Sequence, residues 1–289
     1  MIEPGAFAVL AGVLGALTGS FLNVVIHRLP RGESIVSPGS HCPACGRAIR
    51  PWHNVPVLAW LWLRGRCRDC GVRISVRYPA IEALTAVLFA LLALRIGPSA
   101  GAFLWMAFAA TLVAAAAIDF DHRIIPDELS LGGLAVGLTA MPAVQILEGA
   151  TAGDAFRHAL VGAALGGGLL WIVGFVHARV CVAAGRRFEH WPGDGEDYPA
   201  RFSLDWWTWF PGMGFGDVKL LAMIGAFVGP VGVVQTIVAA SLAGLLFGIG
   251  WAVLRRGLDT PFGFGPMLAL GALVTVLWPV PLGWLASLS

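Results

Sequence analysis

Long apolar runs separated by short polar segments dominate the pattern along this chain of 289 residues. Most of these runs approach the roughly 20 helical residues that cross a hydrocarbon core. The stretch from Asp217 to Arg256 can be read as one kinked helix or as two helices divided at Gly229-Pro230. The pattern predicts eight spans, at residues 5–27, 79–97, 101–119, 129–147, 158–184, 218–231, 233–254 and 264–286.

The positions of the cationic residues favour two helices in that stretch. With two, all of the 19 Lys and Arg residues except Arg95 and Arg157 fall on one side of the membrane. The positive-inside rule then places the basic side in the cytoplasm and both termini outside. Residues 5–27 lack a preceding basic region, so we expect a retained first span rather than a cleavable signal peptide.

Composition supports a membrane protein and limits the classes of partner. Hydrophobic residues make up 57% of the chain and charged residues 12%, against roughly 25% charged residues in a soluble domain. We therefore predict an all-α polytopic membrane protein that contacts membrane lipid. The formal net charge is only +2, which gives no reason to expect a nucleic-acid partner.

Four of the five cysteines form two CxxC pairs in the polar segment after the first span. The pairs are Cys42 with Cys45 and Cys67 with Cys70, close to the C-x2-C-x15–20-C-x2-C spacing of zinc ribbons. Two such turns can supply a tetrahedral set of four thiolates. We predict a structural zinc ion that folds a small cytosolic domain, with a redox pair as the alternative. Cys181 lies in an apolar stretch and is expected to be a buried packing residue.

Aspartates at the ends of apolar runs are the candidate reactive groups. Asp119 ends the third predicted span, and Asp217 opens the sixth directly after Gly214 and Gly216. The topology places both carboxylates at the same depth on the same side. Such a pair can share one proton, with one carboxylate acting on a water and the other protonating a carbonyl oxygen. The two glycines leave the backbone open to an extended peptide.

Other functions of these aspartates stay open on the residues alone. Asp121 and Asp127 are expected in the following loop with a structural or supporting role, and Asp127 after Pro126 is typical of a helix N-cap. Asp217 could also be a cap that interacts with the helix dipole. A carboxylate at the end of an uncharged run such as the one before Asp119 is costly without a function. A proton- or ion-coupled transporter is the main alternative to hydrolysis.

Several motifs in order along nearly the whole chain resemble the type IV prepilin peptidases, membrane aspartic proteases of the GxGD kind. The motifs are GSFLNVVIHRLP (19–30), the two CxxC pairs, PWHNVPVLAWLWLRGRCRDCG (51–71), ISVRYPAIEALTA (74–86), IDFDHRIIPDELSL (118–131), GFGDVKLLAMIGAFVG (214–229) and FGFGPMLALGA (262–272).

The resemblance implies a bifunctional enzyme of the bacterial inner membrane. Such enzymes cleave the basic leader of prepilins and pseudopilins after a glycine at the cytoplasmic face. They then methylate the new N-terminal residue with S-adenosylmethionine. The catalytic pair maps onto Asp119 and Asp217, and the methyltransferase site is expected in the cytosolic domain, supported by Glu82 and the cysteine centre. The supporting residues at the peptidase site are Gly214, Gly216, Asp121, Asp127 and Lys219.

This interpretation divides the chain into five parts. The first helix (1–27) is followed by a cytosolic zinc-binding domain (28–78) and by helices two to five, which carry the first catalytic aspartate (79–184). A cytosolic, acidic, Trp-rich loop (185–216) then leads to helices six to eight, which carry the second catalytic aspartate (217–289). In the loop, Trp206, Trp207 and Trp209 are expected to anchor at the membrane interface. Its acidic residues could attract a basic leader, or simply be solvated.

Two features depart from the family pattern. The loop before GFGD is longer, and His27 and His53 stand where tyrosines are expected. Neither departure touches the proteolytic pair, so they bear only on methylation. A non-enzymatic scaffold for pilus assembly is a third alternative, which predicts that the chain binds prepilin without turnover.

Overall fold

The computed structural model describes residues 3–185, 200, 203–210, 214–255 and 263–279, and these residues are almost entirely helical. Their only β-structure is two isolated bridges, His41 with Ala48 and Arg66 with Arg73. The predicted all-α class is therefore confirmed. The chain forms two compact units, Met1–Ile118 and Asp119–Ser289. The division lies within one helix, α4 (Ala100–His122), whose last turn belongs to the second unit.

The first unit is built on the pair of α1 (Pro4–Arg28) and α3 (Arg77–Ile96), which pack along each other. The two backbones approach closely at Gly19, where a Cβ atom would lie 2.7 Å from the Cα of Glu82. Only glycine fits such a contact, as is common between membrane helices. This contact fixes the height of Glu82 on α3 relative to α1.

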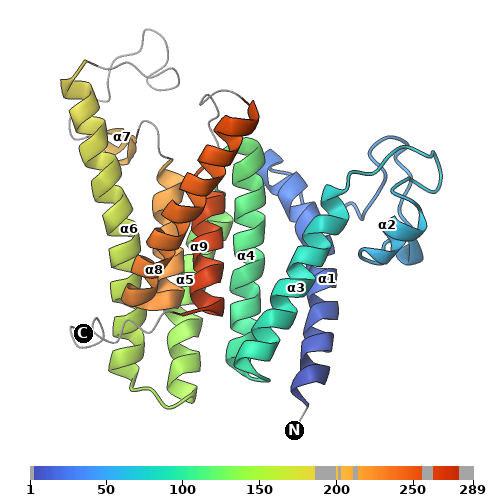
Figure 1. Cartoon of the computed structure of the whole chain (residues 1–289), viewed down its shortest axis with the longest axis horizontal. Coiled ribbons are helices and arrows are strands. Elements are labelled where there is room, and N and C mark those ends of the chain that lie inside the picture. The colour runs from blue at the N-terminus through green and yellow to red at the C-terminus, as the bar shows by residue number, and fades with distance from the viewer. Residues whose placement is uncertain (1–2, 186–199, 201–202, 211–213, 256–262, 280–289) are drawn as a thin grey trace. The chain divides into compact units, whose positions relative to one another are not determined.

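The polar segment between α1 and α3 contains little regular structure (Figure 1). Its short elements are η1 (Leu29–Arg31), η2 (Pro51–His53) and α2 (Leu58–Trp62). The two CxxC turns lie between and after them. So short a segment can bury little apolar surface of its own, which is typical of small domains that are stabilised by a metal or a disulfide.

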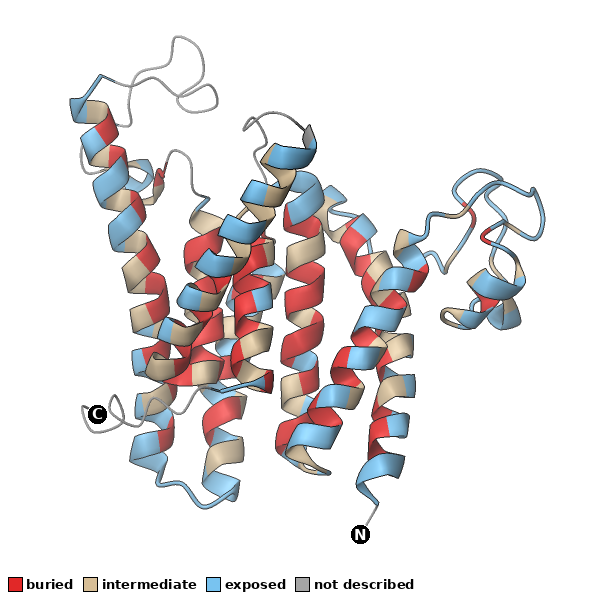
Figure 2. Cartoon of the chain, viewed as in Figure 1, coloured by how far each residue is buried: buried red, intermediate tan, exposed pale blue. Residues whose placement is uncertain are grey.

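The second unit contains the end of α4 and five further helices. These are α5 (Asp127–Leu147), α6 (Ala152–Ala183), α7 (Leu204–Thr208), α8 (Phe215–Arg255) and α9 (Gly265–Leu277). Helix α8 packs against α5, α6 and α9. In the first arm of α8, Leu220, Leu221, Met223 and Ile224 are completely buried. Figure 2 shows the second arm of α8 mostly exposed or intermediate.

Helix α8 is two helical arms joined at a kink. Gly229 has φ 70° and ψ −177°, outside the helical region, and Pro230 follows it. Proline cannot donate a helical hydrogen bond to the preceding turn, and glycine tolerates the positive φ. Figure 1 shows the two arms running in different directions from this point. The division expected at Gly229-Pro230 is thus confirmed.

Six of the described helices are long and apolar enough to span a membrane, with α8 counted as one: α1, α3, α4, α5, α6 and α8. The chain is therefore a multi-pass membrane protein. Helix α9 is shorter, with 13 residues, and the predicted eighth span to residue 286 extends beyond the described residues. On α6 the outward residues Ile172, Val173, Val176 and Val180 are exposed and apolar, which suits lipid rather than water.

Candidate functional site

The structure brings Asp119 and Asp217 together in the second unit. Asp119 lies in the last turn of α4 with 4% of its surface exposed, and Asp217 lies in the first turn of α8 with 6% exposed. The two carboxylates are close enough to interact electrostatically, although 98 residues separate them in the chain. Two buried acidic groups at adjoining helix ends are costly to maintain, which makes this pair the strongest candidate for chemistry in the unit.

The start of α9 supplies a third wall of this site. The backbone N–H of Gly265 donates a hydrogen bond of 3.1 Å to Oδ2 of Asp119. A Cβ atom on Gly263 would overlap the same carboxylate, and one on Gly265 would lie 2.7 Å from Oδ2. The positive end of the helix dipole also favours a carboxylate here. Both glycines belong to the motif FGFGP, to which the sequence alone assigned no role. The feature that could have indicated one is the pair of glycines just before the proline at the start of a helix.

Ile125 lies between the start of α8 and the start of α9. It is 8% exposed, and its side chain lies 3.1 Å from where a Cβ on Gly216 would be, and 3.2 Å from that of Gly265. The sequence suggested that Gly216 leaves the backbone open to a peptide. In the structure, the side chain of Ile125 covers this face of Gly216 instead. Gly214 is exposed and uncrowded, so the open backbone beside Asp217 begins there.

The two supporting aspartates, Asp121 and Asp127, have surroundings that differ from those the sequence predicted. Helix α4 continues to His122, so Asp121 is a helical residue and not part of a loop, and its side chain is exposed. Asp127 is the first residue of α5 and makes no capping hydrogen bond, because Pro126 occupies the N-cap position. Asp127 instead forms an ion pair with Lys219, which ties the start of α5 to the first arm of α8.

The four predicted zinc ligands form a cluster in the first unit. The Sγ atoms of Cys42, Cys45, Cys67 and Cys70 all lie within 4.8 Å of one another. Those of Cys42 and Cys70 are 3.8 Å apart, too far for a disulfide of about 2.05 Å. Tetrahedral zinc with Zn–S bonds of about 2.3 Å requires sulfur atoms about 3.8 Å apart. The cluster can therefore bind a metal, and its geometry fits zinc.

Two copies of the same turn hold the cysteines. In the first, the N–H of Cys42 donates to Arg47 and the N–H of Gly46 donates back to Cys42; the second repeats this pattern with Cys67, Val72 and Gly71. Both glycines have positive φ, 68° and 72°. In the first turn, the backbone N–H groups of Cys45 and Ala44 point at the sulfur and lower the pKa of Cys42 to about 7, which favours the thiolate that a metal needs.

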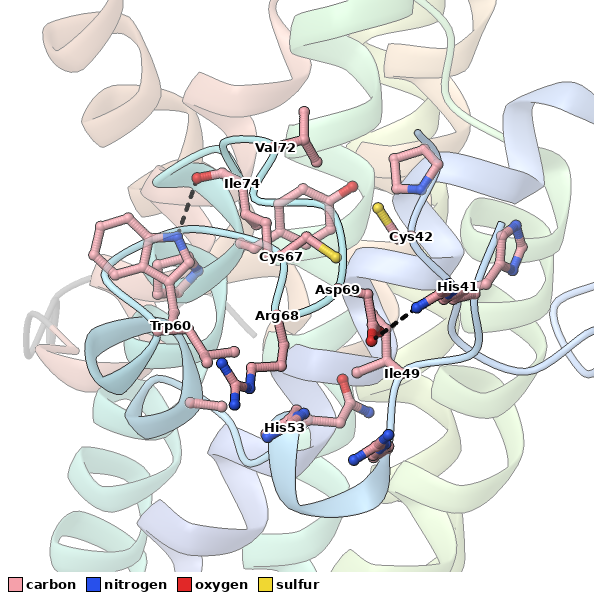
Figure 3. Close-up of a pocket in the computed structure, with 18 of the residues that line it drawn as sticks. His41, Cys42, Ile49, His53, Trp60, Cys67, Arg68, Asp69, Val72 and Ile74 are labelled. Carbon is pink, nitrogen blue, oxygen red and sulfur yellow. Dashed lines mark hydrogen bonds and ion pairs between the residues drawn. The ribbon is translucent and has the colours of Figure 1, made fainter. Parts of the chain in front are cut away.

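A cavity of about 220 Å³ lies between the cysteine turns and the start of α3 (Figure 3). Its wall includes Cys42, Cys67, His53, Trp60, Tyr78 and Glu82. Glu82 is 8% exposed and accepts a hydrogen bond of 2.7 Å from the N–H of Val57. His53, one of the two positions that depart from the family pattern, also lines this cavity, whereas His27 contacts Arg31 near the end of α1.

The tryptophans before Gly214 pack on α6. The ring of Trp207 stacks on Phe175 with centroids 5.3 Å apart, and the Arg179 guanidinium lies 3.5 Å from the centroid of Trp206. Trp209 is only 6% exposed. These contacts hold the segment that leads to Asp217; whether the rings also meet the membrane interface stays a prediction. Glu189, Asp194, Glu196 and Asp197 of the acidic loop lie outside the described residues.

Comparison with known proteins covers both units. Residues 13–96 match the Bacterial Peptidase A24 N-terminal domain, and residues 106–249 match the Type IV leader peptidase family. The chain is 37% identical to a type 4 prepilin-like proteins leader peptide-processing enzyme of Escherichia coli, with 94% of each chain covered. It is 34% and 35% identical to prepilin leader peptidase/N-methyltransferases of Pseudomonas putida and Pseudomonas aeruginosa, with 96% of this chain and 92% of each relative covered.

No solved structure matches the chain. The similarity to these relatives extends over nearly the full length of both partners, so the matched region spans the chain from the cysteine turns to the start of α9. The chain belongs to the type IV leader peptidase family.

Proposed function

We propose that this protein cleaves the basic leader from type IV prepilins and pseudopilins and then methylates the new N-terminal amine with S-adenosylmethionine. Its relatives are named prepilin leader peptidase/N-methyltransferases, and the family match agrees with that activity. The observation that carries the proteolytic half is the pair of buried carboxylates, Asp119 and Asp217, at adjoining helix ends.

The proposed hydrolysis follows the chemistry of paired carboxylates. One aspartate, ionised, accepts a proton from a water, whose oxygen attacks the carbonyl carbon of the scissile bond. The other, protonated, donates its proton to the carbonyl oxygen. The tetrahedral intermediate then collapses, the C–N bond breaks, and the leaving amine takes up a proton. The hydrogen bond from Gly265 to Asp119 holds one carboxylate in place, and Gly214 leaves room beside Asp217 for an extended peptide.

We infer that this site faces the cytoplasm of a bacterial inner membrane. The excess of Lys and Arg on the side that carries Asp119, Asp217 and residues 28–78 supports that orientation. In this arrangement the helices of residues 79–184 and 217–289 contact lipid, and the loop of residues 185–216 is cytosolic. The pilin's apolar helix stays in the bilayer while its basic leader remains outside it.

The four cysteines fit structural zinc rather than catalytic zinc. A complete set of four thiolates leaves no position for water or substrate on the metal. The Cys42–Cys70 spacing of 3.8 Å and the paired turns support this assignment. The metal would hold the two turns together and so maintain the cavity beside them.

The test of the proteolytic assignment uses the purified protein in detergent with a prepilin, followed by mass spectrometry with and without S-adenosylmethionine. Asp119→Asn and Asp217→Asn are each expected to reduce leader cleavage by more than about a thousandfold, since the pair acts as a unit. The exposed carboxylate of Glu128, in the first turn of α5, provides the matched control Glu128→Gln. Cleavage retained by either Asn variant would remove that residue from the site.

The same samples separate the alternatives. Loss of the leader together with a gain of one methyl group supports both activities, whereas loss of the leader alone keeps only the peptidase. The transporter hypothesis, which the family match does not support, requires ion flux in liposomes without added peptide. A scaffold would bind prepilin and leave it intact.

A further inference from the structure

We propose that Glu82 is the proton acceptor of the methylation step. Its carboxylate takes a proton from the new N-terminal ammonium of the pilin, which frees the nitrogen lone pair for attack. This inference rests on the proposed methyl transfer and assigns a catalytic residue to it. The peptidase assignment does not depend on it.

Glu82 differs from the other acidic group at the cavity. Among the described residues that line it, the carboxylates are Glu82 and Asp69. Asp69 forms an ion pair with Arg47 at 3.4 Å, visible in Figure 3, whereas Glu82 is buried and has no ion pair among the contacts of the first unit. A buried carboxylate without a cationic partner is suited to receive a cationic substrate such as an ammonium group.

The surrounding backbone holds Glu82 in one place. The close approach of α1 at Gly19 fixes α3 at this level, and the N–H of Val57 donates to Oε2 of Glu82. Val57 has φ 61° and ψ −53°, close to the rare, strained form of the γ-turn, which is unfavourable for a β-branched residue. Strain of this kind is concentrated at functional sites, where it positions groups for their task. The side chain of Ser20 is a second hydrogen-bond partner of Glu82. A carboxylate has about four acceptor positions, so these two hydrogen bonds leave capacity for a substrate.

The cavity also has the groups that the rest of the reaction requires. Aromatic side chains of Trp60 and Tyr78 can contact the cationic sulfonium of a methyl donor, and Trp60 is anchored by a hydrogen bond of 3.1 Å to the carbonyl of Ile74. Arg50 and Arg68, which also line the cavity, suit the carboxylate of the methyl donor. Pockets that enclose a whole small-molecule ligand usually measure about 300–1,000 Å³. The cavity of about 220 Å³ can therefore hold the reacting ends of the pilin and the methyl donor, but not the complete donor.

The step balances without a further reactant. The ammonium gives one proton to Glu82, and the neutral nitrogen attacks the methyl carbon. The N–C bond forms as the C–S bond breaks, and the sulfur keeps the electron pair and leaves as a neutral thioether. S-Adenosylmethionine supplies the methyl group when bound. The proton on Glu82 is then released to water, and the carboxylate is ready for another cycle.

The test is the pH profile of methylation by Glu82→Gln with a pre-cleaved pilin peptide. An α-amino group has a pKa of about 7.7–8.0, so without an acceptor only about a tenth of it is neutral at pH 7 and about a hundredth at pH 6. The variant is expected to lose about tenfold in kcat at pH 7 and about a hundredfold at pH 6. At pH 9 it should recover to near the wild-type rate.

Readouts other than turnover separate this role from a structural one. Binding of S-adenosylhomocysteine by calorimetry, the zinc content and leader cleavage should all be unchanged in Glu82→Gln. Glu33→Gln, which alters an exposed carboxylate of the same unit that does not line the cavity, should methylate normally at every pH. Methylation by Glu82→Gln at the wild-type rate at pH 6, or joint loss of binding and turnover without recovery at pH 9, would overturn the proposal.

Two further outcomes are also decisive. Besides Asp69 and the cysteines, the other titratable or charged side chains that line the cavity in the described part of the chain are two histidines, His41 and His53, the phenol of Tyr78 and four arginines. If His53→Gln shows the recovery at high pH and Glu82→Gln does not, His53 is the acceptor and the assignment of Glu82 is wrong. If the wild-type protein cleaves prepilin but never methylates it, the proposed methyl transfer fails, and the assignment of Glu82 fails with it.

Discussion

The cysteine centre and the aspartate pair are two candidate sites assembled in opposite ways. The cysteine centre repeats one local turn, in which each CxxC pair and its glycine lie within five consecutive residues. The aspartate pair draws on the end of α4, the start of α8 and the start of α9, at residues 119, 217 and 265 of the chain. Ligand spacing is therefore informative for the first site and uninformative for the second.

Their energetic support differs as well. Cys45 and Cys70 are exposed, and the segment around the cysteines contains few buried residues. In contrast, Asp119 and Asp217 are buried among helices that pack closely on one another. Loss of the metal should therefore disrupt the cysteine centre. The aspartate pair should instead be disrupted by substitutions that alter how closely the helices pack.

The largest effect is expected from Cys42→Ser. The loss of one of four thiolates should reduce the zinc content from one ion per chain to near zero, because structural zinc contributes apparent binding energies of about 10–16 kcal/mol. Methylation should be lost, while leader cleavage falls less than about tenfold because its residues lie in the other unit. Metal analysis and the two activity assays check this, with Cys181→Ser, a buried cysteine in α6, as the matched control. Unchanged zinc content would refute the metal site.

Gly263→Ala should be the sharpest test of the aspartate pair. The new methyl group would overlap the Asp119 carboxylate and displace it, and a displacement of about 1 Å can reduce a rate about a hundredfold. Cleavage should fall by about that factor, with zinc content and methylation of a pre-cleaved peptide unchanged. Gly248→Ala, at a helical position with no atom within 4 Å of the added carbon, is the control. Normal cleavage by Gly263→Ala would show that the start of α9 does not position Asp119.

A smaller effect is expected from the ion pair of Lys219 and Asp127. Lys219 has 20% of its side chain exposed and Asp127 has 58%, so solvent screens the pair and its contribution is about 0.2–1 kcal/mol. Lys219→Met should therefore reduce cleavage no more than about fivefold. In a double-mutant cycle with Asp127→Asn, the second change should add little to the first. A loss above about a hundredfold would mean that Lys219 contacts the substrate itself.

The sequence predicted several parts of this arrangement because they depend on local chemistry. Long apolar runs predict the helices, Gly229-Pro230 predicts the kink of α8, and the CxxC spacing predicts the cysteine centre. It was less accurate at helix ends. Asp121 lies inside α4 and Asp127 is not an N-cap, because one further turn of α4 and a proline at position 126 changed the boundaries.

The contacts of single carboxylates could not be predicted in the same way. Nothing in the sequence around Asp119 indicates that the N–H of Gly265 would bind it, or that Ile125 would cover Gly216. Likewise, the position of Glu82 in a cavity beside the cysteine turns depends on how closely α1 and α3 approach at Gly19.

By itself, the sequence determined the membrane class, the helical composition and the two CxxC turns, and it singled out Asp119 and Asp217 as candidates. These features follow from composition and from spacings of a few residues, which act through local backbone geometry and the cost of charge in a bilayer. Only the tertiary structure decided which backbone group holds Asp119 and which carboxylate lines the cavity. Those outcomes depend on the packing of helices distant in sequence, where a single missing Cβ atom determines how closely two backbones can approach.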